Sequence, residues 1–482
     1  MSSSASTSSG PIIVWFRQDL RLSDNPALHQ AAESGRPVIP VFVLDDDTPG
    51  KWAWGGASRW WLHHSLEELA ADLEAQGVHL VMRSGPSDEV ITDLVEETGA
   101  SAVFWNRCYE PFARKRDEAI KSALKDKGVD ATSFNGSLLA EPWTVQTKTG
   151  DPYKVFTPFW RAEQEVIDPA DPLPAPKSIK PWKSIASDDL ADWKLTPSKP
   201  DWAKGFPDHW TPGEAGAANR LSQFLDERLL SYADGRDRPD RDDTSGLSPH
   251  LHWGEISPRQ IWHQTRNRSE GKNADKFLSE VGWREFSYNL LYHFPDFPDR
   301  NYQDKFDGFP WSENEAAFTA WTKGQTGYPI VDAGMRQLWQ TGWMHNRVRM
   351  ISASFLIKHL LIDWRRGQDW FWDTLVDADL ANNSASWQWV AGSGADAAPY
   401  FRIFNPITQG EKFDPDGKYV KRFVPELAKL PVKYINAPWT APESVLAQAG
   451  IKLGTTYPKP IVDHSQARER ALAAFKGLKE AA

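Results

Sequence analysis

The sequence predicts an N-terminal α/β domain built on a doubly wound parallel sheet, followed by a large all-α domain. Three observations support this fold class. Short apolar runs alternate with amphipathic segments up to residue 135, as parallel strands alternate with crossover helices. Residues 168–215 are rich in proline and lysine, which is typical of an extended connector. From Glu214 almost to the end, apolar residues recur at helical spacing without strand-like runs.

The strands expected in the first domain are short apolar runs that suit a sheet buried on both faces. They lie at residues 12–16, 38–44, 79–83, 102–106 and 131–135. The helices expected between them span residues 25–34, 57–76, 87–98 and 112–127. Ligands of such sheets bind beyond the carboxyl ends of the strands, at the topological switch point.

The segment after the first strand lacks one familiar motif. It reads WFRQDLRLSDN, with no G-x-G-x-x-G turn to hold a pyrophosphate. A dinucleotide bound in the ordinary Rossmann manner is therefore not expected. The charged residues of this segment form either a polar turn network or part of a site; they are Arg17, Asp19, Arg21 and Asp24.

We expect a disordered tail over residues 1–10, the α/β domain over 11–140, a long interdomain linker over 141–215 and the helical domain over 216–482. No run of eighteen apolar residues is present, so no membrane span is expected. The Ser-rich residues 2–9 lack the apolar core of a signal peptide, and a cytoplasmic location is expected.

Charge and cysteine content exclude several classes. A net charge of −10 argues against nucleic-acid binding over the whole surface, so a DNA partner requires a locally basic groove. The single cysteine, Cys108, excludes a disulfide framework and a cysteine-built metal site. We predict no metal site.

Residues 326–413 concentrate aromatic, basic and amide side chains in helix-compatible sequence. Trp364, Trp387 and Trp389 offer large flat surfaces that suit stacking on rings. Six polar residues here are costly to bury unless they are paired or hold a ligand: Arg347, Arg349, Asp377, Asp379, Asn382 and Asn383. This composition predicts a pocket for a large, polar, aromatic cofactor that opens towards an aromatic substrate.

Two motifs precede that segment. In DDTSGLSPHLHW (242–253), the hydroxyls around Gly246 and the start of a helix form either an N-capping turn or a phosphate cradle. In the helix expected over 277–295, Glu280, Trp283 and Arg284 share one face. Glu280 and Arg284 form either an exposed ion pair or, with Trp283, part of a stacking platform.

Further motifs lie within the segment itself. Asn346 and Met350 share a helical face, whereas Arg347 is expected to point elsewhere. Trp387 and Trp389 point about 200° apart on a helix, so one can face the core and the other a cavity. Asp377 and Asp379 are suited to hold an arginine or a protonated ring nitrogen. A basic region is either a solvated face or, with Gln409, a contact for phosphates; it comprises Arg402, Lys412, Lys418, Lys421 and Arg422.

Over nearly its whole length the chain resembles the photolyase/cryptochrome family. The motifs that carry the resemblance are WFRQDLRLSDN, TGYPIVDAGMRQL, GWMHNRVRM, LLIDWRRG, DADLANNSASWQW and FRIFNPITQGEKF. The segments WWLHHSL, WTPGEAGA and SPHLHWGEISP make it most similar to the bacterial class III branch of the cyclobutane pyrimidine dimer photolyases. The resemblance implies light-driven DNA repair, in which excited FADH⁻ transfers an electron to a flipped-out dimer.

The resemblance also implies a U-shaped FAD in the helical domain and an antenna chromophore between the domains. Similarity to the class III branch favours methenyltetrahydrofolate as the antenna, with 8-hydroxy-5-deazaflavin and a second flavin as alternatives. Phe112-Ala113 stands where some folate-binding members have Asn-Glu. The His345-Asn346 pair favours cyclobutane dimers over (6-4) lesions. Damaged DNA is the expected partner, and a monomer without an obligate protein partner is expected.

Residue roles follow from the resemblance position by position. FAD contacts are implied for Tyr232, Thr244, Ser245, Gly246, Leu247, Ser248, Phe277, Arg284, Arg349, Asp377, Asp379 and Asn383, with Arg349 paired to Asp377. Lesion and DNA contacts are implied for Arg236, Glu280, Trp283, Asn346, Arg347, Met350, Trp389, Arg402, Gln409 and Lys412. Catalytic roles are implied for Glu280 at the lesion, for Asn383 at the flavin N5, and for an electron-transfer chain of Trp387, Trp364 and Trp311.

Three alternatives remain open at the level of sequence. The first is a cryptochrome-type blue-light photoreceptor without repair activity, which uses the same flavin photochemistry. The second is a light-independent flavin oxidoreductase, for which the sequence offers no nicotinamide site. The third is a DNA-binding protein without any chromophore.

Overall fold

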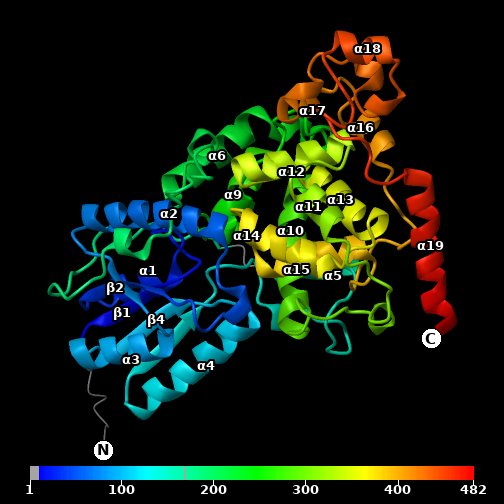
Figure 1. Ribbon diagram of the computed structural model, residues 1–482. Coiled ribbons are helices and arrows are strands. Elements are labelled where there is room, and N and C mark those ends of the chain that lie inside the picture. Colours follow the sequence, from blue (N-terminus) through cyan, green and yellow to red (C-terminus); the bar gives the residue numbers. More distant parts are fainter. Residues whose placement is uncertain (1–9, 168–169, 482) are drawn as a thin grey trace, which may run out of the picture.

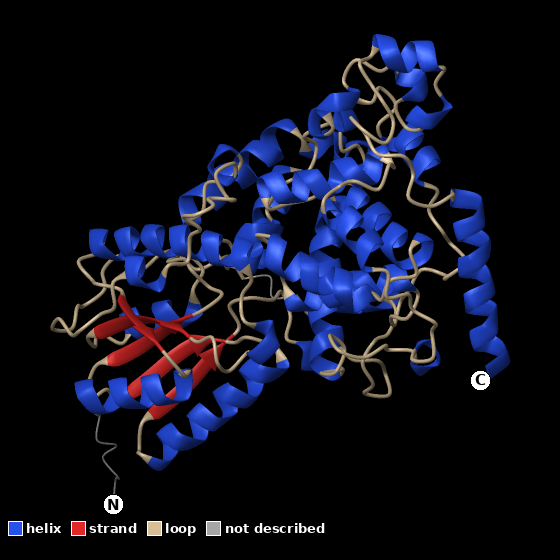
Figure 2. Cartoon of the chain, viewed as in Figure 1, coloured by secondary structure: helices blue, strands red, loops and turns tan. Residues whose placement is uncertain are grey.

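The computed structural model describes residues 10–167 and 170–481; residues 1–9 of the predicted tail lie outside this range. The α/β part contains a five-stranded parallel sheet in the order β3-β2-β1-β4-β5 (Figures 1 and 2). Its strands are β1 (Ile12–Phe16), β2 (Val38–Leu44), β3 (Val81–Ser84), β4 (Ala102–Asn106) and β5 (Asp130–Phe134). The strand order reverses direction between β1 and β4, which is the switch point of a doubly wound sheet.

Helices cover both faces of this sheet. They are α1 (Pro26–Glu33), α2 (Gly56–Ala75), α3 (Ser87–Thr98) and α4 (Pro111–Asp126). Ile12, Val14 and Phe16 of β1 pack with α1 and α2, while Ile13 and Trp15 pack with α3 and α4. Alternate residues of one strand thus belong to different cores, and every residue of β1 is buried. The predicted doubly wound sheet is confirmed.

The carboxyl ends of β1 and β4 are closed by their own side chains. Arg17 donates to both carboxylate oxygens of Asp117 at 2.9 and 2.8 Å. Asn106 donates to Asp19 at 2.6 Å and to Asn25 at 2.8 Å. Each of these residues is at most 8% exposed. The segment after β1 is therefore a polar turn network, the first of the two alternatives that the sequence left open.

The chain between the two parts includes one helix that the sequence did not predict. Helix α5 (Phe156–Glu163) lies within the span assigned to the linker and packs against α10 (Lys272–His293). Farther along, Pro181 pairs with Val38 of β2 as an isolated parallel bridge. The span from 170 to 213 otherwise consists of turns, short 3-10 segments and irregular chain, as its proline content predicts.

Beyond residue 213 the described residues form no strand, and α10 and α15 pack together near the centre of this part (Figure 1). Its other helices are α6 (Glu214–Glu227), α7 (Tyr232–Gly235), α8 (Ser248–His252), α9 (Pro258–Arg268), α11 (Glu315–Thr322), α12 (Pro329–Thr341), α13 (Asn346–Ser354), α14 (Trp364–Thr374), α15 (Leu380–Ala391), α16 (Pro406–Phe413), α17 (Lys418–Phe423), α18 (Glu443–Gln448) and α19 (His464–Ala481). Within the described residues, no helix is both long enough and apolar enough to cross a membrane.

Candidate functional site

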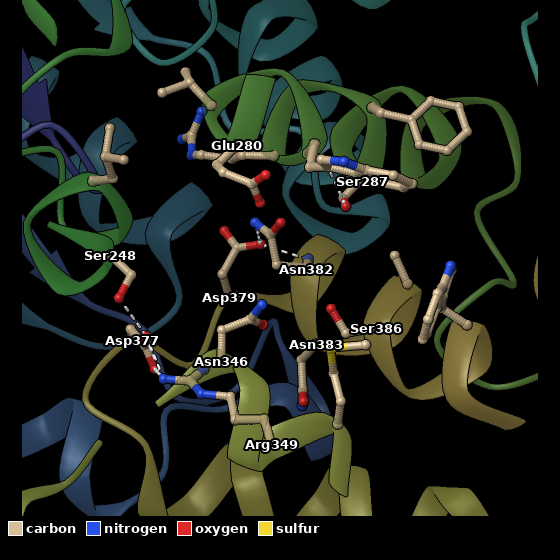
Figure 3. Close-up of a pocket in the computed structure, with 18 of the residues that line it drawn as sticks. Ser248, Glu280, Ser287, Asn346, Arg349, Asp377, Asp379, Asn382, Asn383 and Ser386 are labelled. Carbon is tan, nitrogen blue, oxygen red and sulfur yellow. Dashed lines mark hydrogen bonds and ion pairs between the residues drawn. The ribbon is translucent and has the colours of Figure 1, made fainter. Parts of the chain in front are cut away.

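A cavity of about 530 Å³ lies between α10, α13, α15 and the segment from Tyr232 to His252 (Figure 3). This volume is in the range of small-molecule and cofactor sites. Twenty of the predicted site residues line it: Tyr232, Arg236, Thr244, Ser245, Gly246, Leu247, Ser248, Phe277, Glu280, Trp283, Arg284, Asn346, Arg347, Arg349, Met350, Asp377, Asp379, Asn383, Trp387 and Trp389. The fold thus gathers residues from distant parts of the chain around one space.

The hydroxyl-rich turn before α8 forms one wall. Gly246 has a φ of +62°, and a Cβ added there would lie 2.6 Å from the guanidinium of Arg220. This left-handed conformation favours glycine, and it turns the chain so that Thr244, Ser245 and Ser248 all border the cavity. The wall is therefore polar, with hydroxyl groups and backbone amides available to a ligand.

Arg349 and Asp377 form an ion pair in the cavity wall. Arg349 donates to the two carboxylate oxygens of Asp377 at 3.0 and 2.8 Å, and Ser248 donates to the same carboxylate at 2.6 Å (Figure 3). The Nε of Arg349 donates to the carbonyl of Met344 at 2.7 Å. This network ties α13, the start of α8 and the chain before α15 together, and it contains the Arg349–Asp377 pair implied by the family resemblance.

Asp379 caps α15 and is held by its neighbours. Its carboxylate accepts from the backbone N–H and the side-chain amide of Asn382 at 2.8 and 2.7 Å. The hydroxyl of Tyr288 also donates to it, and the Nδ1 of His252 lies 3.7 Å away. Burial alone would raise the pKa of Asp379, but His252 and Tyr288 lower that pKa to about 2. The cavity therefore carries a fixed negative charge beside Asn382 and Asn383.

Helix α10 contributes the opposite wall of the cavity. Its residues Glu280 and Arg284 do not form the ion pair that was one of the two predicted alternatives. Glu280 points into the cavity (Figure 3) and pairs with Arg236 and, at 2.8 Å, with Lys276. Arg284 is 9% exposed and donates to the Ser137 carbonyl at 2.8 Å. The exposed Glu280–Arg284 ion pair is thus the wrong alternative, because Arg284 turns inward against the N-terminal part.

The two tryptophans of α15 occupy different environments, as their spacing predicts. Trp387 is 2% exposed and packs on Phe371 at a centroid distance of 5.0 Å. A Cβ at Gly367 would lie 2.1 Å from this ring, so only glycine lets α14 approach it. Trp389 is partly buried and also borders the cavity.

The remaining predicted residues lie outside the cavity. Trp364 is fully buried and donates to Asn301 at 2.9 Å, while the partly buried Trp311 packs on Phe309 at 4.3 Å. Arg402 and Lys412 are exposed, and Gln409 is half-buried on α16.

The guanidinium of Arg347 is directed at partners other than Asn346 and Met350, in agreement with its predicted direction. Its guanidinium pairs with Asp237 at 2.8 Å and lies over the ring of Phe413. Arg347 is nevertheless one of the residues that border the cavity, together with Asn346 and Met350.

Several lining residues were missed at the sequence level. They include His252, Trp343, Ser386 and Asp396. His252 is 3% exposed, and neither of its ring nitrogens has a hydrogen-bond partner. The sequence feature that could have indicated this residue is HLHW, which directly follows the hydroxyl-rich turn of the cavity wall. A histidine buried there is not explained by packing of an apolar core.

A second cavity of about 230 Å³ lies between the start of α2 and the helical part. Its lining includes the rings of Trp202, Phe206 and Trp339 and the side chain of Asp373. Asp373 accepts from the backbone N–H of Gly56 at 2.8 Å. This cavity is narrow and aromatic, with a carboxylate at its edge.

Comparison with known proteins identifies the family. Residues 12–177 match the DNA photolyase model, and residues 277–477 match the FAD binding domain of DNA photolyase. A deoxyribodipyrimidine photo-lyase of Agrobacterium fabrum is 56% identical over 98% of this chain and 99% of its own length. Cryptochrome-1 of Arabidopsis thaliana is 42% identical over 96% of this chain and 70% of its own length.

The likeness extends to a solved structure. The crystal structure of a bacterial class III photolyase from Agrobacterium tumefaciens superposes with a TM-score of 0.95 at 56% identity, covering 100% of both chains. The fold of this chain therefore has a counterpart that matches it from end to end. The chain belongs to the photolyase/cryptochrome family.

Proposed function

We propose that the protein is a deoxyribodipyrimidine photo-lyase that repairs cyclobutane pyrimidine dimers in DNA under blue light. The observation that carries this function is the 530 Å³ cavity with an aromatic, charged mouth, in a chain 56% identical to a photolyase over 98% of its length. The mouth brings Glu280, Trp283, Asn346 and Trp389 together on three helices. These groups suit an extrahelical pyrimidine dimer: two flat rings to stack on, and a carboxylate and an amide to bind base edges.

The residues of the cavity fit FAD. Neither ring nitrogen of His252 has a hydrogen-bond partner, and the Thr244–Ser248 turn presents hydroxyls, in a space of the volume expected for a cofactor. We assign the phosphates to this turn and the polar edge of the ring system to Asp377, Asp379 and Asn383. When bound in its reduced form, FAD supplies the light-driven electron that opens the cyclobutane ring.

The protein's own residues position the lesion, and none of the assigned contacts recognises the DNA sequence around it. Extruding the two linked bases of the lesion from the duplex costs a few kcal/mol, which is less than for undamaged bases. Glu280 and Asn346 hydrogen-bond the bases in this assignment, and Trp283 and Trp389 form the walls of the slot. The exposed Arg402 and Lys412 contact phosphates outside the cavity, which gives affinity without base specificity.

Trp387, Trp364 and Trp311 are assigned to deliver electrons from the surface to the cavity. Trp387 borders the cavity, Trp364 is buried, and Trp311 is partly exposed. These environments suit a route that begins at Trp311 at the surface and ends at Trp387 at the cavity. Trp387→Phe should block light-driven reduction of the oxidised cofactor, yet spare repair when the reductant is dithionite. Equal loss of both activities would refute the route.

We assign methenyltetrahydrofolate, the expected antenna, to the second cavity, where Trp202 and Trp339 offer faces for a flat ring and Asp373 a carboxylate for its amino groups. The absorption spectrum of chromophores released by denaturation distinguishes folate from 8-hydroxy-5-deazaflavin and from a second flavin. Trp339→Ala should lower the folate content and leave FAD content unchanged. Normal folate content in this variant would exclude the assigned site.

A repair assay tests the function directly. A thymine-dimer oligonucleotide is mixed with the reduced protein, and dimers are counted in blue light and in darkness. Light-dependent loss of dimers is expected. No loss with FAD-loaded, reduced protein would leave the cryptochrome-type photoreceptor, and turnover of NAD(P)H in darkness would favour a flavin oxidoreductase. A colourless protein would exclude all three.

A further inference from the structure

Trp283 has only one face available to a ligand. Phe156, the first residue of α5, stacks on the other face with ring centroids 3.9 Å apart and planes within 9°. Phe156 itself does not line the cavity, whereas Trp283 does. The stacked ring thus lies directly behind the tryptophan that forms the wall of the slot.

The position of Phe156 is fixed from two directions. Its backbone N–H donates to the carboxylate of Asp396 at 2.8 Å. Asp396 borders the cavity and lies in the segment after α15, where the N–H of Ala398 donates to the carbonyl of Trp389 at 3.1 Å. Phe156 is therefore linked both to Trp283 on α10 and to the segment that follows Trp389 on α15.

The helix that carries Phe156 is closely docked on α10. A Cβ at Gly282, the residue before Trp283, would lie 2.4 Å from the ring of Trp160. Trp160 is nearly parallel to Phe156, with an interplanar angle of 10°, and Phe159 packs on Phe286 at 5.2 Å. Since Gly282 has no side chain, α5 approaches α10 closely enough to hold Phe156 against Trp283.

We propose that Phe156 is a positioning residue that sets the plane of Trp283 and thereby the width of the slot between Trp283 and Trp389. This rests on the proposed function, because it takes the occupant of the slot to be an extruded pyrimidine dimer. A wall whose ring is already held in the bound orientation binds more tightly than one that must be ordered on binding. Phe156 acts on affinity for the lesion through Trp283 and makes no contact with it.

Phe156→Leu removes the stacking ring and keeps an apolar side chain of similar bulk. The expected result is about 3- to 10-fold weaker binding of a thymine-dimer oligonucleotide, the range measured for aromatic pairs. KM should rise by the same factor while kcat and FAD content stay unchanged. Phe156→Tyr, which keeps the ring, should restore wild-type affinity.

Tyr153→Leu is the matched control, because it removes an aromatic ring three residues earlier that contacts Phe159 rather than Trp283. Its lesion affinity should equal that of the wild type. If Phe156→Leu does not fold, Phe156→Met provides the same loss of stacking with a more adaptable side chain. Unchanged lesion affinity in the folded variant would overturn the proposal.

A double-mutant cycle separates this role from a general structural one. If Phe156 acts only through Trp283, Phe156→Leu should have no further effect on lesion affinity in a Trp283→Ala background. Additive losses would overturn the proposal. If the wild-type protein repairs dimers and the Phe156→Leu variant binds the lesion with equal affinity, the role of Phe156 is refuted and the proposed function stands. Wild-type protein that repairs no dimers defeats the proposed function.

Discussion

Buried charged and amide side chains gather in two regions of the molecule. In one region they bond mainly to each other, and in the other they surround a cavity. At the switch point of the sheet, Arg17 and Asp117 pair with each other, and Asn106 bonds Asp19 and Asn25. In the helical part, similar residue types surround a cavity of about 530 Å³. The first set pairs its carboxylates and amides with one another and leaves the Nε of Arg17 without a partner, whereas the second surrounds a space and leaves both ring nitrogens of His252 without a hydrogen-bond partner.

The difference teaches where a fold of this kind holds its ligand. A parallel sheet offers a crevice at its switch point, but here that crevice is filled by its own ion pair. Buried polar groups alone do not identify a binding site. Buried polar groups that surround a cavity do, because a ligand in the cavity can complete their hydrogen bonds. Four measurements test this contrast.

The largest effect is expected at the closed region. Asp117→Ala leaves Arg17 buried without its carboxylate and removes the acceptor of the Trp105 indole N–H. A broken buried pair costs about 3–5 kcal/mol of unfolding free energy. Urea denaturation measures this, with Asp46→Ala, which breaks an exposed pair with Arg59, as the control expected to cost under about 1 kcal/mol. Equal losses would contradict the contrast.

The second effect depends on pH. The pKa of Asp379 lies at about 2, below its ordinary value of 3.8. A carboxyl with a lowered folded pKa stabilises the protein above its unfolded pKa, and this contribution is lost as the pH falls from about 4 towards 2. The difference corresponds to about 2 kcal/mol. Asp379→Asn should flatten the pH dependence of unfolding in this window; parallel curves would show that its hydrogen bonds contribute little.

The third effect concerns the open region. Asp377→Ala removes the carboxylate that binds both Arg349 and Ser248. FAD affinity should fall about tenfold or more, equivalent to about 1.4 kcal/mol, because the two groups lose their common anchor. Flavin fluorescence during titration of the apoprotein measures the dissociation constant. Asp363→Ala, which removes a partner of Arg365 in the N-cap of α14, is the control expected to bind FAD normally.

The smallest effect is expected at the mouth. Glu280→Ala should lower the yield of dimer repair about fivefold, the value of one hydrogen bond of about 1 kcal/mol, while FAD content stays unchanged. Asp275→Ala removes another acidic residue of α10 that pairs with Arg266 at the surface, and it should repair normally. A normal yield with Glu280→Ala would remove Glu280 from the assigned lesion contacts.

The regular elements were predictable because their signals are local. The apolar runs of β1 and β2 and the spacing of residues in α10 and α15 determine strand and helix independently of the rest of the chain. Helix α5 was missed because Pro158 and the following prolines resemble a linker. Pro158 is the third residue of α5, a first-turn position whose N–H has no helical acceptor, so it is compatible with the helix.

The candidate site was predictable as a set of residues but not as a geometry. Sequence motifs and the family resemblance indicated Arg349, Asp377 and Glu280. The inward turn of Arg284 and the stacking of Phe156 behind Trp283 were not predictable. Helical spacing gives the direction of a Cβ, but the partner met in that direction belongs to a segment more than a hundred residues away.

The amino-acid sequence by itself determined the two kinds of architecture, the family and the residue types available for cofactor and lesion, because each depends on patterns within a short stretch. The tertiary structure alone decided that the switch point is closed and the helical cavity open. That decision depends on which distant groups meet: Asp117 reaches Arg17 and accepts from its guanidinium with both carboxylate oxygens, whereas the residues around His252 leave a space that only another molecule fills.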